Sequence, residues 1–315
     1  RNISEILKKK NGYKILKRHI NEKEKTKVQL LGLKGIHYRQ NLKRTYPQME
    51  ISSHVVGITD TDRIGIQGTE LVFNRFLKGR DGVFTGLKSP IGVMEGERSS
   101  ALDGSDLKLT IDIRLQSIAY HELKRSVEYY GATAGSIIII DPKNSEILAL
   151  TNFPSFNPSN RRNLTDMSSL RNRATVDIFQ PGSVLKPLAM AAIIDSGKVK
   201  RDLITNTSPG WIEFGGYKTR DFRDYGELSL SEIISYSSNV GMVKLCKDLD
   251  SDYLFQYFSN FGIGILPNNI LIPSREGFLP ESSMLSERDK VSSCYGYGLS
   301  MSAIQIAQAY QVFAN

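Results

Sequence analysis

The sequence predicts an α+β fold in which helices flank an antiparallel sheet. An apolar run at 135–140 predicts a buried strand, and residues 146–151 predict a returning strand across the Asp-Pro-Lys-Asn turn at 141–144. Apolar residues with helical spacing dominate the second half, over 183–197, 229–236, 239–249, 252–261 and 300–314. Two strands alone make a marginal sheet, so further strands are either hidden in this pattern or lie beyond Asn315.

The region before residue 105 predicts a second, smaller set of elements. Residues 1–50 are basic and favour helix, whereas the β-branched run at 53–59 predicts a short strand. A Gly-containing turn near residue 65 leads to a helical pattern over 68–77. Residues 78–106 are rich in Gly, Ser and charge, which is typical of a linker or hairpin, and 83–93 favours one or two β-arms.

A new pattern begins at Asp106. Leu107, Leu109 and Ile111 alternate with polar residues, which predicts a strand, and Asp112 then caps a helix whose apolar stripe continues to Val127. We therefore expect two domains, residues 1–104 and 105–315, with their boundary near residue 105.

The composition is that of a folded protein. The chain has 315 residues, of which 40% are hydrophobic and 23% charged. The apolar stretch at 137–140 is far shorter than the roughly 18 residues that a membrane span needs. Because the sequence begins with Arg1 and ends at Asn315 inside a helical pattern, we expect it to be part of a longer protein.

The formal net charge of +8 is concentrated at the beginning of the chain. Residues 1–45 hold 14 Lys or Arg and three Glu, a net +11, so the remainder is near −3. Such a run is either a solvated basic face or a surface for anionic lipid or an acidic partner. Nucleic acid is disfavoured, because the run lacks interleaved aromatics and the chain has no zinc-finger spacing.

The cysteines and histidines indicate no metal site. Cys246 and Cys294 are not in a C-x-x-C motif, and two thiols in so long a chain do not make a disulfide framework, so we expect both to pack as small apolar residues. The histidines lack the spacing of metal ligands or of a zincin motif, and we expect them to be structural or exposed: His19, His37, His54 and His121.

The strongest local signal is a serine followed by a lysine at the start of a helix. Pro181-Gly182 breaks the chain before Ser183, and Pro187 is tolerated only in a first helical turn, so the helix begins close to Ser183. The positive end of the helix favours an alkoxide there. Lys186 lies three residues on, on the same face, and a partly desolvated lysine can take the serine proton.

A second signal is Ser237-Ser238-Asn239, in a break between two predicted helices. Alone, these residues would be helix caps, and Ser183 alone would be one too. Each pattern has another copy, Ser105-x-x-Lys108 before a strand and Ser155-x-Asn157 in a Pro-rich loop, and we interpret the first of these copies as chance. Ser-x-x-Lys followed by Ser-x-Asn, in this order and local context, is far more specific than either motif.

With these motifs the chain resembles the class B penicillin-binding proteins, most closely the division-specific peptidoglycan D,D-transpeptidases of the FtsI type. The resemblance covers nearly the whole chain. It rests on Ser183, Lys186, Ser237 and Asn239 together with the segments 53–57, 68–70, 109–116, 134–136, 141–142, 154–158, 171–173, 237–241 and 295–298.

The resemblance implies a fold and a set of roles. Residues 1–104 would be part of a non-catalytic α+β pedestal of the dimerisation type, and 105–315 most of a β-lactamase-like transpeptidase domain. Ser183 would be the acyl-ester nucleophile, Lys186 the general base and Ser237 the proton relay. Asn239 would bind substrate, and no cofactor or metal is implied.

The chain departs from the family pattern in three ways. The family usually has Glu where this chain has Gln180, a neutral near-isostere. The Lys-Thr/Ser-Gly motif, expected after the helix at 300–314, is absent, and Lys218-Thr219-Arg220 lacks its glycine. A membrane anchor and the first pedestal segments are also absent. We therefore expect that the sequence as given cannot complete its site or its sheet.

The implied function is cross-linking of septal peptidoglycan, with D-Ala-D-Ala stem peptides as substrates and β-lactams as covalent inhibitors. The implied partners are division proteins and a septal glycosyltransferase, and the implied location is the bacterial inner membrane, with the catalytic domain in the periplasm. Two alternatives stay open. One is a β-lactam-hydrolysing or sensing relative, and the other is a non-enzymatic division scaffold.

Overall fold

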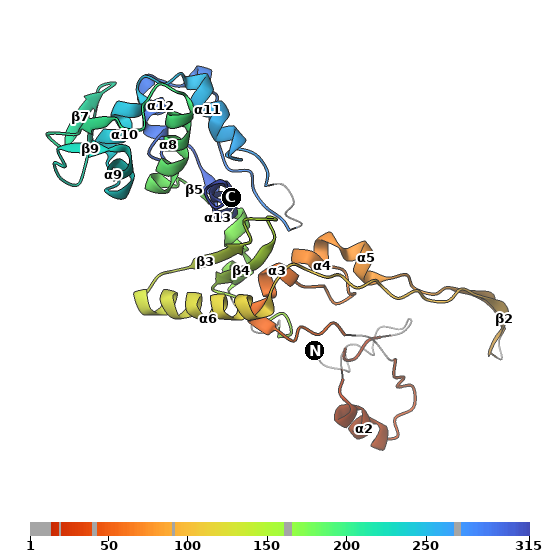
Figure 1. Ribbon diagram of the computed structural model, residues 1–315. Helices are drawn as coiled ribbons and strands as arrows, with labels where there is room; N and C mark the ends of the chain where they lie inside the picture. Colours follow the sequence, from red (N-terminus) through yellow and green to blue (C-terminus); the bar gives the residue numbers. More distant parts are fainter. Residues whose placement is uncertain (1–13, 19, 40–42, 90–91, 161–165, 268–271) are drawn as a thin grey trace. The chain divides into compact units, whose positions relative to one another are not determined.

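A computed structural model describes residues 14–18, 20–39, 43–89, 92–160, 166–267 and 272–315 (Figure 1). The chain divides into two compact units, Arg1–Tyr46 and Pro47–Asn315. The first contains α2 (Glu22–Leu30), where Asn21 and Glu24 form a reciprocal capping box. The rest of the helix-rich prediction for the N-terminal region falls partly on 1–13, 19 and 40–42, which lie outside the described residues. The domain boundary near residue 105 stays a prediction.

The predicted strand at 53–59 is wrong, because this segment forms the short helix α3 (Ser53–Val56). A strand would bury alternate side chains, whereas Ser53, His54 and Val55 are all buried here. Ser53 Oγ lies 2.8 Å from Ser155 Oγ, and His54 Nε2 lies 2.8 Å from the carbonyl oxygen of Ser169. These contacts far along the chain override the β propensity of the sequence.

The rest of the segment before residue 105 is close to the prediction. The helical pattern over 68–77 is divided at Phe73 into α4 (Gly68–Val72) and α5 (Asn74–Lys78). The predicted β-arms are confirmed as β1 (Phe84–Ser89) and β2 (Gly92–Arg98), which pair antiparallel.

The predicted strand at 107–111 is also wrong, although the helix after it is confirmed. The alternating Leu109 and Ile111 pack against a small apolar core without forming a ladder, and the segment touches a later strand through a hydrogen bond from Thr110 Oγ1 to the carbonyl oxygen of Ile147. Asp112 caps α6 (Ile113–Tyr130) by accepting from two backbone N–H groups of its first turn.

The predicted hairpin is confirmed as β3 (Gly135–Ile140) and β4 (Ile147–Phe153), paired antiparallel. Figure 1 shows α6 along one side of this hairpin and α13 (Ala303–Tyr310) on the other. A Cβ at Gly135 would meet Leu123 of α6, while Ile138 and Ile140 pack with Ile304 of α13. The hairpin is therefore covered on both faces.

The five predicted helices of the second half are confirmed with shifted or shorter bounds, and the pattern at 300–314 begins with a two-residue strand before its helix; their apolar faces form the main core. The sequence did not predict α7 (Arg173–Val176) or α12 (Glu287–Ser293). The helical elements that build this part of the chain are η3 (Met167–Leu170), η4 (Gly182–Leu185), α8 (Lys186–Asp195), α9 (Leu230–Ser235), α10 (Asn239–Cys246), α11 (Ser251–Asn260), η5 (Ser282–Met284) and η6 (Gln311–Phe313).

Several strands were hidden from the sequence pattern because each is short. In the described residues they form separate antiparallel pairs and add nothing to the β3–β4 hairpin. The pairs are β5 (Ile178–Phe179) with β10 (Met301–Ser302), β6 (Ile204–Asn206) with β9 (Glu227–Ser229), and β7 (Trp211–Phe214) with β8 (Tyr217–Arg220).

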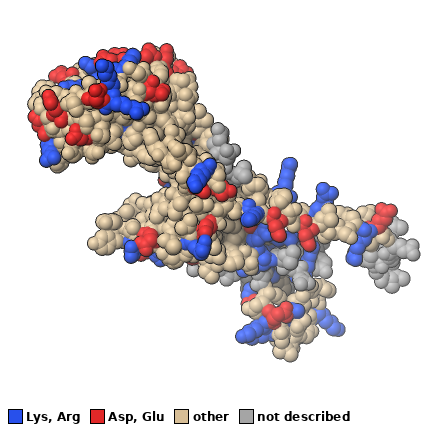
Figure 2. All heavy atoms as spheres, viewed as in Figure 1, with Lys and Arg blue, Asp and Glu red and all other residues tan. Residues whose placement is uncertain are grey.

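On the face seen in Figure 2, acidic and basic side chains are interspersed over the part that holds α9 to α12. Among the described residues, no helix combines the length and the apolar character that crossing a bilayer demands.

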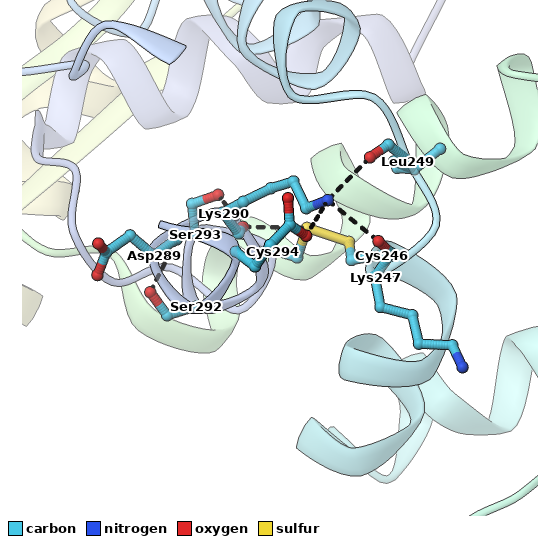
Figure 3. The surroundings of a disulfide bond; sticks show 9 residues. Cys246, Lys247, Leu249, Asp289, Lys290, Ser292, Ser293 and Cys294 are labelled. Carbon is cyan, nitrogen blue, oxygen red and sulfur yellow. Dashed lines mark hydrogen bonds and ion pairs between the residues drawn. A yellow bond between two sulfur atoms is a disulfide. The ribbon is translucent and has the colours of Figure 1, made fainter. Parts of the chain in front are cut away.

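The two cysteines correct the prediction, because they form a disulfide between Cys246 at the end of α10 and Cys294 just after α12 (Figure 3). Both are fully buried, as expected, but as a cross-link rather than as separate thiols. The sequence hid this pairing, because 48 positions separate two residues that adjacent helices bring together.

We expect the Cys246→Ala/Cys294→Ala variant to lose about 4 kcal/mol of unfolding free energy, because the bond closes a loop of 48 residues and restricts the unfolded chain. Urea denaturation under oxidising conditions measures the loss. An unchanged midpoint would show that the bond contributes no stability.

Candidate active site

Ser183 lies in the single 3-10 turn η4 that precedes α8, as the position of Pro187 predicted. Gly182 adopts a left-handed φ of 58° and turns the chain into this helix. Its N–H donates to the carbonyl oxygen of Gly296 at 3.0 Å. The side chain of Ser183 is exposed, so its hydroxyl is open to a substrate.

Lys186 begins α8 and is almost completely buried, with 1% of its surface exposed. Its Nζ donates to the carbonyl oxygen of Ser237 at 2.5 Å, to Ser237 Oγ at 2.9 Å and to Asn239 Oδ1 at 2.7 Å. The structure thus brings together three of the four predicted site residues. A buried amine needs such partners, because an unpaired one would be strongly destabilising.

Burial lowers the pKa of Lys186 from 10.5 to about 8, and the negative charge of Asp221 opposes this shift. A pKa near 8 leaves a useful fraction of neutral amine at neutral pH. The buried amine can therefore accept a proton, which an exposed lysine with an ordinary pKa does much less readily.

Ser237 occupies the break between α9 and α10, in a left-handed conformation with φ 56° that is uncommon for a serine. This conformation turns both its carbonyl oxygen and its hydroxyl toward Lys186 Nζ. The cap of α10 is Ser238, whose Oγ accepts from the N–H of Gly241 at 2.9 Å. Asn239, the first residue of α10, donates from Nδ2 to the carbonyl oxygen of Arg220 at 3.0 Å.

Ser183 stands apart from this hydrogen-bonded cluster. In the ranges that the structure covers, its hydroxyl has no side-chain hydrogen-bond partner, and the hydrogen bonds of Lys186 Nζ go to Ser237 and Asn239. The two residues nevertheless begin the same helical segment, three positions apart. An exposed hydroxyl three positions before a buried amine of lowered pKa is a residue pair that can generate a nucleophile once the two groups approach.

Sequence reasoning missed Asp221, which follows β8. Its carboxylate accepts from the N–H of Asn239 at 2.5 Å, from the N–H of Val240 at 3.0 Å and from Ser238 Oγ at 2.6 Å. A carboxylate at the first turn of α10 satisfies free backbone donors and complements the helix dipole. Asp221 lies 18 positions before Asn239, so no local sequence pattern indicated that it caps α10.

The other copies of the motifs have structural surroundings. Lys108 lies in a non-helical segment, so the serine–lysine pair at 105–108 does not share a helical face, as predicted. Ser155 Oγ donates to the carbonyl oxygen of Glu50, which ties the second Ser-x-Asn copy to the helical turn before α3. The Nζ of Lys218 lies 3.5 Å from the centroid of the Trp211 ring, so this lysine makes a cation–π contact within the β7–β8 pair.

His54 and His121 are not among the hydrogen-bond partners of Lys186 Nζ, and His19 lies outside the described residues. His54 is buried, and burial lowers its pKa to about 4, so it is neutral and structural. In the described part of the chain, no group of three or more His, Cys, Asp or Glu side chains is placed to hold a metal ion.

Comparison with protein families gives two matches. The penicillin binding protein transpeptidase domain matches residues 135–315, which contain Ser183, Lys186, Ser237 and Asn239. The penicillin-binding protein dimerisation domain matches residues 2–109.

Individual proteins are similar over most of the chain. It is 35% identical over 308 residues to the probable peptidoglycan D,D-transpeptidase PbpC of Pseudomonas aeruginosa, covering 95% of this chain and 54% of that protein. It is 34% identical to the peptidoglycan D,D-transpeptidase FtsI of Escherichia coli K12, covering 97% and 52%. A peptidoglycan synthetase structure from Bifidobacterium adolescentis superposes with a TM-score of 0.78 at 29% identity, covering 95% and 55%. The chain thus spans about half the length of these relatives.

We expect Asp221→Ala to lower the free energy of unfolding by about 2–3 kcal/mol, because it removes a charged cap and leaves backbone donors of α10 without partners. Asp224→Ala is the matched control: Asp224 is exposed and accepts from Ser208 Oγ and the N–H of Gly226 in a loop. Thermal or urea unfolding of both variants distinguishes them. Equal losses would contradict a special role for Asp221.

Proposed function

Because the chain belongs to the penicillin-binding protein transpeptidase family, we propose that the protein it comes from is a peptidoglycan D,D-transpeptidase that cross-links stem peptides through a serine acyl-enzyme. One observation carries the proposal: Lys186 Nζ is buried at the start of α8 and held by Ser237 and Asn239, directly after the exposed Ser183. In this proposal Ser183 is the nucleophile, Lys186 the base three positions later, and Ser237 the relay, which the fold brings to Lys186 from 51 positions away.

In the first half-reaction, neutral Lys186 takes the hydroxyl proton of Ser183 while Ser183 Oγ attacks the carbonyl carbon of the D-Ala-D-Ala amide. The backbone N–H of Ser183, at the positive end of the helical segment, stabilises the developing oxyanion. The carbon–nitrogen bond then breaks. The proton returns through the hydroxyl of Ser237 to the leaving D-Ala, and the stem peptide stays bound to Ser183 as an ester.

In the second half-reaction, the amine of a neighbouring stem peptide attacks this ester. Neutral Lys186 takes a proton from the attacking amine, the ester carbon–oxygen bond breaks as the new amide forms, and Lys186 passes that proton to Ser183 Oγ. The new amide is the cross-link. In this proposal the amide of Asn239, whose Oδ1 accepts from Lys186, also binds the substrate backbone. A β-lactam opens its ring on Ser183 in the same way, but its leaving nitrogen stays tethered.

We further propose that this domain acts in an oxidising compartment, with the periplasm as the family implies. The Cys246–Cys294 disulfide supports this location, because such bonds are rare in a reducing cytoplasm. A membrane anchor, division proteins and a septal glycosyltransferase belong to the same proposal. They rest on the similarity to the FtsI relative, as does the division role.

The proposal is tested by the intact mass of the full-length protein after exposure to benzylpenicillin. We expect a stable adduct of one drug molecule, and none on a Ser183→Ala variant, since that variant lacks the attacking oxygen. Rapid loss of the adduct with drug turnover would favour a β-lactam hydrolase. No adduct on either protein would favour a non-enzymatic scaffold.

The acylation rate should rise with pH. With a pKa of about 8, the neutral fraction of Lys186 grows about tenfold between pH 7 and pH 9 and then levels off. Stopped-flow acylation by a fluorescent penicillin across this range measures the midpoint. A Ser237→Ala variant should be slower but keep a sigmoidal profile. A rate that stays flat or falls over this range would exclude Lys186 as the base.

A further inference from the structure

Two helices of the catalytic half are tied together next to the site. α10 begins at Asn239, which contacts Lys186, and ends at Cys246, whose sulfur is bonded to Cys294 after α12. Lys290 of α12 adds a second tie, because its Nζ donates at 3.0 Å to the carbonyl oxygens of both Lys247 and Leu249 (Figure 3). We call Cys246, Cys294 and Lys290 the α10–α12 link.

The α10–α12 link is built into the core. Both cysteines are completely buried, and Lys290 is 4% exposed although it carries a charge. Its ammonium is balanced by Glu287 Oε2 at 2.7 Å and by the carbonyl oxygens at the C-terminal end of α10, where a cation complements the helix dipole. A buried lysine with all these partners fixes α12 against α10 at a defined position.

The segment that follows Cys294 contacts the backbone of Gly182, the residue before Ser183. Directly after Cys294, the segment 295–298 turns at Gly296, with φ 89° and its carbonyl oxygen accepting from the N–H of Gly182. A Cβ on Gly296 would lie 1.9 Å from the carbonyl oxygen of Gly182, so the two backbones touch. Further on, β10 pairs with β5, Met301 facing Phe179.

Ser183 needs this support because it precedes the α-helix. Lys186 belongs to α8 and is fixed by its packing, whereas Ser183 lies in one 3-10 turn after a left-handed glycine. Segment 295–302 holds the backbone on the N-terminal side of that turn. Asn239, at the other end of α10 from the disulfide, holds the amine of Lys186. The backbone before Ser183 is thus held by segment 295–302, the amine of Lys186 is held by Asn239, and the α10–α12 link connects these two supports.

We propose that the α10–α12 link is a positioning device for the active site, which fixes the backbone beneath Ser183 relative to the helix that carries Asn239. The inference rests on the proposed function for its effect on acylation. Its residues touch neither substrate nor the reacting atoms. Breaking the link lets segment 295–298 move away from Gly182, so Ser183 loses its alignment with Lys186.

The test compares full-length variants with the wild type. Cys246→Ala/Cys294→Ala removes the disulfide, and Lys290→Met removes the ammonium while keeping the bond, so that one variant remains if the other fails to fold. Leu123→Ala is the matched control, because it empties a buried site in α6 that packs against β3, away from the link. All are assayed well below their melting temperatures.

Two readouts separate positioning from stability. For a fluorescent penicillin, we expect the limiting acylation rate constant to fall about tenfold to a hundredfold in the disulfide variant, with the initial dissociation constant little changed, because misplacement of a nucleophile acts on the chemical step. In Lys290→Met, the limiting acylation rate constant should also fall, but by a smaller factor. By hydrogen exchange, segment 178–183 should exchange faster in both link variants but not in Leu123→Ala.

The outcomes are distinguishable. If the wild type is not acylated, the proposed function fails, while hydrogen exchange of 178–183 still decides on the link. If the wild type is acylated, and the link variants match Leu123→Ala in both acylation and exchange, the link is a staple of the fold and the inference is overturned.

Discussion

The burial of the Lys186 amine is the constraint on which the rest of the site depends. An amine removed from water must be given oxygen partners, and here they all come from the short break between α9 and α10. These oxygens reach the amine because Ser237 adopts a left-handed backbone conformation and Asn239 is the first residue of α10. The start of α10 is in turn fixed by the carboxylate of Asp221.

The same burial creates the difference between Lys186 and Ser183. The two residues are three positions apart, yet one is 1% exposed and the other faces solvent. A hydroxyl must be open to receive a substrate, whereas the base must be desolvated for its pKa to fall. The change from a 3-10 turn to an α-helix between them permits both conditions, and Tyr310 adds support by donating to the carbonyl oxygen of Val184 at 2.6 Å.

Those helices, strands and site residues whose signals lie within a few neighbouring positions could be predicted from the sequence. The capped helix after Asp112, the 135–151 hairpin and the helix after Pro181-Gly182 carry their signals within a few residues. Ser183, Lys186, Ser237 and Asn239 were readable because two short motifs occur in order beside helix breaks. The errors at 53–59 and 107–111 share a cause: apolar and β-branched residues there pack against distant partners in a helical or unpaired backbone.

What the sequence did not disclose is held by contacts between distant positions. Asp221 acts on a helix that begins 18 residues later, and Gly182 meets Gly296 across more than a hundred residues. The close approach is possible because Gly296 carries no Cβ, which would otherwise lie 1.9 Å from the carbonyl oxygen of Gly182. The motifs therefore identify the candidate groups, Ser183 among them, while the segment from α12 to β10 contacts the backbone at Gly182 and, in our proposal, fixes where Ser183 lies.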